Sequence, residues 1–421
     1  MMLRLHVIGV LRSNFERYGF EPLETPALEY AETLEGKFGE EADKLIYKFE
    51  DRGGRQVGLR YDLTVPMCRV VACYPDLVKP FKRYQIAPVW RAERPQKGRY
   101  REFWQCDADI VGSGGMLADA EVLGLVYTGL HSLGFTHFKT KVNNRKILVA
   151  LAGCAGVPLE QAAGSYRAVD KLDRIGPDGV RQELLEEGIA PAVADSLLGL
   201  VRVKGPGAEM LAEMKERLAA FPLGVEGVAE LEQVLRHVRD IGIPEESLEV
   251  DFSMVRGLEY YTGPIFETVV EKPRIGSIAG GGRYDKLVGL LGGGDYPAVG
   301  VAFGLERILD VMEELEMGPR RKTVAHVLVT VFDATTAGDS LRLASELRAA
   351  GIATEVYLKD GKLGNQLRYA GRKGMPLVLI LGPSEIAEGV AVLRDMASQE
   401  QRGVPLGQVV EAVRQAVTAL A

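Results

Sequence analysis

The stretch that most constrains the fold runs from Phe81 to Asp109, FKRYQIAPVWRAERPQKGRYREFWQCDAD, where residue character alternates with a period of two on both sides of a turn-rich loop. This alternation predicts a β-hairpin with its loop at Arg94 to Gly98. One face comprises Tyr84, Ile86, Pro88 and Trp90, then Tyr100, Trp104, Cys106, Ala108 and Ile110. The other comprises Arg83, Gln85, Arg91 and Glu93, then Arg101, Phe103, Gln105, Asp107 and Asp109. We expect the first face to pack against the rest of the protein and the second, the chemical face, to carry the functional side chains.

The chemical face is unusually basic near the loop. From Arg91 to Arg101 there are five basic residues and one acidic residue. Guanidinium groups match phosphate oxygens, and an aromatic ring such as Phe103 can stack on a purine, so the pattern indicates a phosphate site beside a ring platform. The alternative is an exposed basic hairpin whose charges only keep it in solution.

The composition is that of an ordinary globular protein. The 421 residues are 47% hydrophobic and 26% charged, which is enough chain for two or three domains with cores of their own. The 51 basic residues are outweighed by 58 acidic ones, net −7, which argues against a protein dominated by electrostatic nucleic-acid binding. Local basic patches remain compatible with this balance.

Neither a membrane protein nor a metal protein is indicated. No apolar run is long enough to span a bilayer, and the N-terminal stretch lacks a signal-peptide core, so we expect a cytoplasmic protein without membrane partners. The four cysteines, Cys68, Cys73, Cys106 and Cys154, form no CxxC pair and have no histidine cluster beside them. We therefore expect no disulfide framework and no metal site with dedicated protein ligands.

The segment before the hairpin contains a first candidate ligand site. Residues 3 to 18 have the spacing of an amphipathic helix that stops at Gly19, and FEPLETPALEY then favours extended chain. YKFEDRGGRQVGLRYDLTVP predicts a second hairpin, in whose second arm Arg60, Asp62 and Thr64 share a face. Asp62 and Thr64 could bind an ammonium group, or Asp62 could cap a helix ahead of Val65.

Helical and strand segments alternate after the central hairpin. Leu117 to Leu133 predicts a helix, and residues 148–244 change to short amphipathic helices that we interpret as an inserted helical domain or a packing appendage. The chain then returns to strand. RGLEYYTG brings Arg256, Tyr260 and Tyr261 together, either as ligand groups or as core tyrosines beside a surface arginine.

Two glycine-rich stretches close this part of the chain. IGSIAGGGRYDKLVGLLG places three glycines in a strand, where a ligand can lie against the backbone. AVGVAFGLERIL places Arg307 at the start of a helix, as a ligand group or simply as a solvated helix residue. Residues 318–323 are interpreted as a linker, and residues 323–421 alternate strand and helix as a small α/β domain with parallel pairing and a closing helix from Leu406.

These motifs resemble those of a known family. VWRAERPQKGRYREF resembles motif 2 of the class II aminoacyl-tRNA synthetases, specifically that of the histidyl-tRNA synthetases. FEPLETPALEY resembles motif 1, AVGVAFGLERIL resembles motif 3, and RGLEYYTG and AGGGRYD are similar to the two histidine-specific motifs. The chain departs from the pattern in having Glu259 where Asp is commoner, and in lacking the short glycine-containing segment that normally precedes the first helix.

The resemblance implies a fold: an α+β protein with the class II antiparallel sheet flanked by helices. The catalytic core would comprise residues 1–147 and 245–318, the helical insertion residues 148–244, and the anticodon-binding α/β domain residues 323–421. It also implies a homodimer built around motif 1, and an insertion that covers the tRNA acceptor stem.

The resemblance further implies roles for particular residues. Arg91 and Arg256 would be catalytic at the α-phosphate of ATP. ATP would be bound by Arg91, Glu93, Arg101, Phe103 and Arg307, with Mg²⁺ on its phosphates. Histidine would be bound by Asp62, Thr64, Gln105, Asp109, Arg256, Tyr260 and Tyr261. Arg94 and Gln96 are candidate contacts to the acceptor end of histidine tRNA.

The implied activity is histidine–tRNA ligation, in which ATP activates L-histidine to the adenylate and histidine is then transferred to the 3′ end of its tRNA. The alternative is a catalytically inactive paralogue that senses histidine as the regulatory subunit of ATP phosphoribosyltransferase. Such paralogues usually lose the catalytic arginine and the C-terminal domain. Here Arg256 and residues 323–421 are present, which favours the enzyme.

Overall fold

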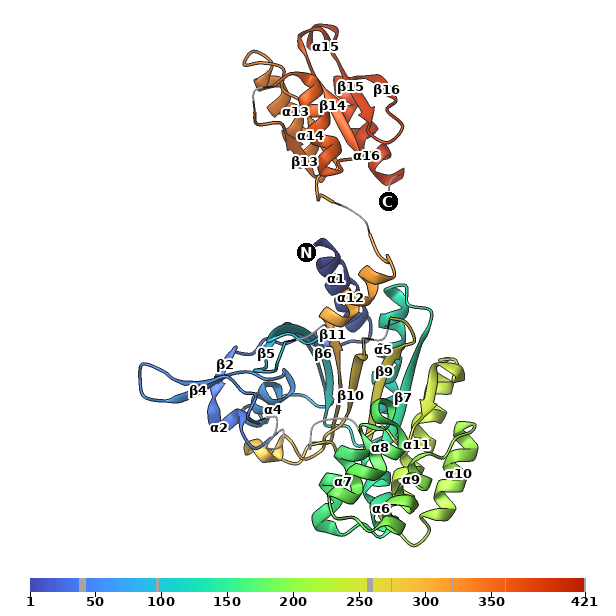
Figure 1. The fold of residues 1–421 in the computed structure, drawn as a ribbon. Helices are drawn as coiled ribbons and strands as arrows, with labels where there is room; N and C mark the ends of the chain where they lie inside the picture. The colour runs from blue at the N-terminus through green and yellow to red at the C-terminus, as the bar shows by residue number, and fades with distance from the viewer. Residues whose placement is uncertain are drawn as a thin grey trace. The chain divides into compact units, whose positions relative to one another are not determined.

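The computed structural model describes residues 1–37, 43–95, 98–255, 260–273, 275–319, 322–359 and 361–419. The chain forms two compact units, residues 3–318 and residues 319–421, which are described separately here (Figure 1).

The first unit is built on an eight-stranded sheet in the order β1-β5-β6-β11-β10-β9-β7-β8. Its strands are β1 (Glu21–Pro22), β5 (Phe81–Trp90), β6 (Glu102–Val111), β7 (Phe138–Asn144), β8 (Leu248–Val250), β9 (Pro264–Val270), β10 (Ser277–Arg283) and β11 (Ala298–Gly304). The two outer pairs, β1–β5 and β7–β8, are parallel, whereas every pair between them is antiparallel. The predicted antiparallel sheet is confirmed.

The predicted hairpin is the pair β5 and β6. Its register places Arg83 opposite Asp109 and Ala87 opposite Gln105, so the residues of the expected chemical face do share one face. The other face enters the main hydrophobic core through Tyr84, Cys106 and neighbouring apolar residues. The period-two pattern therefore predicted both faces within the two strands, but it was wrong for Tyr100, which precedes β6, is 40% exposed and lines a cavity on the other face.

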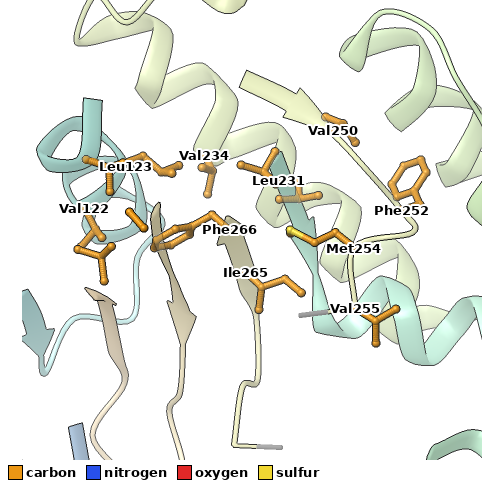
Figure 2. Packing of buried hydrophobic residues seen from close by; sticks show 14 of the residues in the cluster. Val122, Leu123, Leu231, Val234, Val250, Phe252, Met254, Val255, Ile265 and Phe266 are labelled. Atoms are coloured by element: carbon orange, nitrogen blue, oxygen red, sulfur yellow. The ribbon is translucent and has the colours of Figure 1, made fainter. Parts of the chain in front are cut away.

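Helices cover the packing face of the sheet. They include α1 (Met2–Arg17), α5 (Leu117–Ser132), α11 (Pro222–Asp240) and α12 (Leu305–Glu314). Phe15 of α1 places its ring 5.5 Å from that of Tyr84 and 5.8 Å from that of Phe303. Figure 2 shows Val122 and Leu123 of α5 beside Leu231 and Val234 of α11, over Phe266 of β9.

The opposite face carries a smaller layer. It contains the three-stranded sheet of β2 (Leu28–Tyr30), β3 (Lys48–Glu50) and β4 (Gln56–Leu59), with α2 (Ala31–Leu34) and α4 (Thr64–Cys73). β3 and β4 form the second predicted hairpin. The expectation that Arg60, Asp62 and Thr64 share a strand face is wrong, because β4 ends at Leu59 and Arg60 turns its guanidinium to the carbonyl oxygens of Thr25 and Pro88.

The segment between β7 and β8 is helical, as predicted. It contains α6 (Arg145–Ala155), η1 (Leu159–Gln161), α7 (Ala162–Val169), α8 (Leu172–Glu186), α9 (Pro191–Val201), α10 (Gly207–Arg217), α11 and η2 (Glu245–Ser247). Its buried residues are continuous with those of the sheet, since α11 packs directly on α5. The division of the first unit into a core and an insertion stays a prediction.

The second unit is an α/β domain with a five-stranded sheet in the order β13-β12-β14-β15-β16. Its elements are β12 (Val327–Val329), α13 (Ala337–Ala349), β13 (Thr354–Val356), α14 (Leu363–Lys373), β14 (Leu377–Ile380), α15 (Pro383–Glu388), β15 (Val390–Asp395), β16 (Gln401–Pro405), η4 (Leu406–Gln408) and α16 (Val409–Ala419). The predicted parallel pairs are confirmed, but the antiparallel hairpin β15–β16 was not predicted. None of the described helices has the length and apolar character needed to cross a membrane.

Candidate active site

A cavity of about 370 Å³ lies over the central strands, on the face that carries Arg83 and Asp109. Its lining comes from the β5–β6 hairpin, β10, β11, the start of α12 and the segment that leads into α4. The lining includes Asp62, Thr64, Arg91, Phe103, Gln105, Asp109, Tyr260, Tyr261, Tyr284, Gly300 and Arg307. Segments far apart in the sequence thus converge on one hollow.

One end of the cavity is cationic and aromatic. The guanidinium carbon of Arg91 lies 4.2 Å from the ring centre of Tyr61 and 5.0 Å from that of Phe103. Its Nε donates to the carbonyl oxygen of Tyr61 at 3.2 Å. A guanidinium held in this way beside an aromatic ring suits a nucleotide, with phosphate on the arginine and the base on the ring.

Two residues at the start of α12 link the elements that surround this end of the cavity. Arg307 Nε donates to the carbonyl oxygen of Gly98 at 3.1 Å, and its Nη1 to that of Ser277 at 2.8 Å. The neighbouring Glu306 accepts from the backbone N–H of Trp104 at 2.9 Å and pairs with Arg4 at 2.9 Å. Helix, hairpin loop and β10 are therefore fixed to one another around the cationic end.

Asp62 accepts a hydrogen bond at a helix start, as its sequence position suggested, and it also lines the cavity. Oδ1 accepts from the backbone N–H of Val65 at 3.0 Å, in the first turn of α4. Oδ2 is buried, lines the cavity and has no hydrogen-bond partner among the described residues. Burial raises the pKa of Asp62 to about 6, although the Val65 N–H and nearby Arg91 lower it. A cation entering here would meet a carboxylate oxygen that has no hydrogen-bond partner among the described residues.

The floor of the cavity is a buried ion pair. Arg83 and Asp109 are 0% and 2% exposed, and Arg83 Nη2 lies 2.7 Å from Asp109 Oδ2. The hydroxyl of Tyr284 donates to Asp109 Oδ1. Burial raises the pKa of Asp109, whereas Arg83 and the Tyr284 hydroxyl lower it. Arg83 and the Tyr284 hydroxyl therefore position the carboxylate, and both oppose the effect of burial, which is the larger one and raises its pKa overall.

Three tyrosines and an amide form the wall beside this pair. The ring centres of Tyr260 and Tyr261 are 4.9 Å apart, and those of Tyr260 and Tyr284 are 5.8 Å apart. Gln105 Oε1 is buried without a hydrogen-bond partner among the described residues. Carboxylate, amide and phenols around a hollow suit a small, flat, polar ring that both donates and accepts hydrogen bonds.

The glycines of β10 and β11 are required by close backbone approach. A Cβ atom at Gly281 would lie 1.9 Å from the carbonyl oxygen of Gly300. Both glycines line the cavity, so the expected role of bringing a ligand close to the backbone is compatible with this arrangement.

The structure brings most of the predicted site residues together. Arg91, Glu93, Phe103 and Arg307 line the cationic end, and Asp62, Thr64, Gln105, Asp109, Tyr260 and Tyr261 line the remainder. Arg101 is not part of the lining and donates through Nε to the carbonyl oxygen of Glu93 at 3.2 Å. Arg94 is exposed and also lies outside the lining. Arg256 and Gln96 lie outside the described residues.

Two site residues were missed. Tyr284 stands in the predicted motif AGGGRYD but was given no role, and Arg83 was placed on the chemical face without a partner. A register prediction for the hairpin would have found Arg83, because it lies directly opposite Asp109. No group of three or more histidine, cysteine, aspartate and glutamate side chains that could hold a metal ion occurs within the part of the chain that the structure describes.

Comparison with known proteins agrees with this geometry. Residues 4–308 match the family described as "Histidyl-tRNA synthetase", and residues 326–416 match the "Anticodon binding domain". The histidine–tRNA ligase of Aeropyrum pernix is 44% identical over 98% of this chain and 94% of its own length. That of Cytophaga hutchinsonii is 40% identical over 97% of this chain and 95% of its own length.

Solved structures show the same fold. The histidyl-tRNA synthetase from a Nostoc species is 30% identical, with a TM-score of 0.87 over 99% of this chain and 96% of that one. A Bacillus halodurans protein described as an ATP phosphoribosyltransferase regulatory subunit/histidyl-tRNA synthetase has a TM-score of 0.74 at 22% identity, a likeness of fold alone. The family match covers well over half of the residues and the ligase relatives are aligned over nearly their whole length, so this chain belongs to the histidyl-tRNA synthetase family.

Proposed function

We propose that this protein is a histidine–tRNA ligase, which activates L-histidine with ATP and transfers it to histidine tRNA. The observation that carries the proposal is one cavity with a cationic, aromatic end and a polar end whose Asp62 Oδ2 and Gln105 Oε1 lack partners among the described residues. The relatives named histidine–tRNA ligase, aligned over nearly their whole length, support the same activity.

In the first step the histidine carboxylate attacks the α-phosphorus of ATP. A bond between the carboxylate oxygen and this phosphorus forms, which gives histidyl-adenylate, and the bond to pyrophosphate breaks. Arg91 is the group proposed to neutralise charge on the α-phosphate, since its guanidinium is held by Tyr61 and Phe103. Phe103 would stack on adenine, and Glu93 would contact the amino group of the base. Arg101 would also contribute to ATP binding, and Arg307 would bind the γ-phosphate. Arg256 is proposed as the second arginine at the α-phosphate.

Histidine itself would lie in the polar end. Asp62 and Thr64 would hold its ammonium group, because a buried carboxylate oxygen without a partner is best satisfied by a cation. Gln105, Asp109, Tyr260, Tyr261 and Tyr284 would surround the imidazole ring. Sites that bind a ring through buried hydrogen-bonding groups reject analogues that lack the matching atoms, which accounts for selectivity.

In the second step a hydroxyl of the terminal adenosine attacks the adenylate carbonyl, an ester forms and AMP leaves. No side-chain nucleophile takes part, so catalysis would rest on positioning and charge stabilisation. Arg94 and Gln96 remain candidate contacts to the acceptor end of the tRNA. The domain that matches the anticodon-binding family would recognise the other end of the same molecule.

Mg²⁺ is proposed to enter with ATP. The described residues contain no cluster of carboxylates that could hold the ion alone, and Glu306 at this end already accepts from Trp104 and pairs with Arg4. The fit is therefore that of an ion carried mainly by the nucleotide phosphates, as is usual for Mg²⁺.

The proposal includes a homodimer in the cytoplasm. Leu28, Tyr30 and Phe49 of the three-stranded sheet are each almost half exposed, and a second copy of the chain would cover them. Sedimentation of the purified protein tests this part, with a monomer at micromolar concentration as the contrary result.

The activity is tested by exchange of labelled pyrophosphate into ATP by the purified protein. We expect exchange that requires histidine and is not supported by other amino acids, followed by charging of histidine tRNA. Histidine binding without exchange would instead indicate the regulatory alternative, a histidine sensor for ATP phosphoribosyltransferase, which the ligase relatives do not favour.

A further inference from the structure

The ion pair beneath the cavity fixes the charge that a ligand ring meets. Arg83 is fully buried, and its Nη2 lies 2.7 Å from Asp109 Oδ2 and donates to the carbonyl oxygen of Leu63 at 3.1 Å. Arg83 reaches no solvent and does not line the cavity, whereas Asp109 does. Arg83 therefore touches no ligand in the cavity itself and acts through the carboxylate that it contacts, which makes it a positioning residue.

The carboxylate cannot turn away from this arrangement. Tyr284 donates to Oδ1, and the space beside Oδ1 is left open only because residue 300 is glycine. Each carboxylate oxygen can accept more than one hydrogen bond, so Asp109 still has acceptor capacity toward the cavity.

The remaining groups around Asp109 add little positive charge. Burial raises the pKa of the Asp107 carboxyl well above its usual range, and it also raises the pKa of the Cys68 thiol and the Tyr260 phenol, which favours the neutral form of each group. The titratable and charged groups that face Asp109 from the described elements are Arg83, Tyr284, Asp62, Asp107, Cys68 and Tyr260. Among these, Arg83 is the cation.

We propose that Arg83 makes this cavity select histidine with a neutral imidazole ring, because it cancels the charge of Asp109 from beneath. This inference rests on the proposed function and specifies the protonation state of its substrate. An imidazolium ring here would be a second cation beside Asp109, the carboxylate that Arg83 already pairs with, in a buried site where charge is costly. A neutral ring instead donates one N–H to Asp109 and leaves its other nitrogen to accept.

The first test uses the wild-type protein and histidine labelled with ¹⁵N in its ring. At pH 6.0 a free imidazole ring, with a pKa of about 6.5, is mostly cationic. We expect the bound ring to show one protonated and one unprotonated nitrogen in its ¹⁵N chemical shifts. Shifts of an imidazolium ring at this pH would overturn the proposal.

A kinetic test separates protonation of the substrate from protonation of protein groups such as Asp62. The kcat/KM for pyrophosphate exchange is measured with histidine and with its 1,2,4-triazole analogue, whose ring stays neutral in this pH range, and the two values are divided. We expect the ratio to level off above about pH 7.5 and to fall about 5-fold between pH 6.5 and pH 5.5, as free histidine becomes protonated. A ratio that stays constant to pH 5.5 would overturn the proposal.

Variants test the part played by Arg83. In Arg83→Met the pair formed by Asp109 and the ring must hold one more proton, so the ring ¹⁵N shifts are expected to change; Arg83→Lys keeps the charge and should keep the wild-type shifts. Arg60→Met is the matched control, since it removes another buried guanidinium whose hydrogen bonds go to Thr25 and Pro88. Wild-type shifts in Arg83→Met would exclude this role for Arg83.

The outcomes separate the two proposals. Histidine-specific exchange with an imidazolium ring would leave the proposed function standing and overturn only the inference. Absence of histidine-dependent exchange would remove the proposed function and the inference with it. If Arg83→Met does not fold, the two wild-type measurements decide the protonation state of the ring, and changed ring shifts in Arg83→Lys, which keeps the charge, would overturn the role given to that charge.

Discussion

Gly300 and Asp109 face each other across β11 and β6 so closely that a Cβ atom on Gly300 would lie 1.9 Å from Asp109 Oδ1. The carboxylate is not free to move aside, because Arg83 holds one of its oxygens and Tyr284 the other. Glycine at position 300 is therefore a condition for the floor of the cavity.

Gly300→Ala is expected to damage the histidine end of the site. Forcing a methyl group against a pinned carboxylate should lower the free energy of unfolding by about 1–3 kcal/mol and raise the KM for histidine at least about 10-fold. The control is Gly9→Ala in α1, where an added Cβ meets nothing within 4 Å and better helix propensity should stabilise by about 0.5–1 kcal/mol. Urea unfolding and pyrophosphate exchange measure both effects, and a wild-type KM in Gly300→Ala would contradict the arrangement.

Asp62 is expected to reduce the stability of the empty protein. Its pKa is raised from 3.8 to about 6 on folding, so the folded state binds its proton more tightly than the unfolded state does. Stability from this group is then present at low pH and lost as the pH rises through about 4 to 6, a loss of about 3 kcal/mol when complete. Asp62→Asn removes this loss while keeping an oxygen for the N–H of Val65.

Asp62→Asn is expected to make the protein more stable at neutral pH and to abolish its activity. At pH 7.5 Asp62→Asn should unfold at higher urea concentration than wild type, near pH 4 the two should be similar, and histidine-dependent exchange should be lost in the variant. Urea unfolding at both pH values and pyrophosphate exchange at pH 7.5 test this expectation. Equal stability at pH 7.5 would show that burial of this carboxylate costs nothing.

The parts of the fold that were predicted correctly depend on local patterns. The β5–β6 hairpin, the helix from Leu117 and the glycine strand β10 each repeat a period or a turn signal within about ten to twenty residues. The hairpin sequence also indicated where the site lies, because one of its faces combines charged residues with an aromatic ring, which is unusual for a simple solvated strand. The same local signal placed Asp62 at a helix start, where the structure confirms a hydrogen bond to Val65.

The missed features depend on contacts between distant segments. Arg60 left the expected face because the carbonyl oxygens of Thr25 and Pro88, 35 and 28 residues away, hold its guanidinium. Tyr284 reaches Asp109 across 175 residues, which no period can show. The β15–β16 hairpin was overlooked because its strands follow the short helix α15 and are joined through a turn at Asp395, whose carboxylate accepts from Ala397 and Ser398.

Phe103 is expected to act on ATP and not on histidine. Base stacking on an aromatic ring contributes about 1–3 kcal/mol, so Phe103→Leu should raise the KM for ATP by roughly 5- to 150-fold. Histidine binding measured without ATP should be unchanged, because Phe103 lies with Arg91 at the cationic end. Phe332→Leu, which changes an exposed ring of the second unit, is the control. Equal weakening of ATP and histidine binding by Phe103→Leu would show a general collapse of the cavity.

Arg307 offers a test of how the nucleotide phosphates are bound. Its guanidinium already donates to the carbonyl oxygens of Gly98 and Ser277, so a change here could act on the γ-phosphate or only on the hairpin loop. Hydrogen bonds to charged groups contribute about 1.5–3 kcal/mol, and Arg307→Lys is therefore expected to raise the KM for ATP and for pyrophosphate about 10- to 100-fold. A non-hydrolysable analogue of histidyl-adenylate, which lacks the β- and γ-phosphates, should bind as it does to wild type. If the analogue weakens as much as ATP does, Arg307 acts by holding the loop and not by contacting the phosphate.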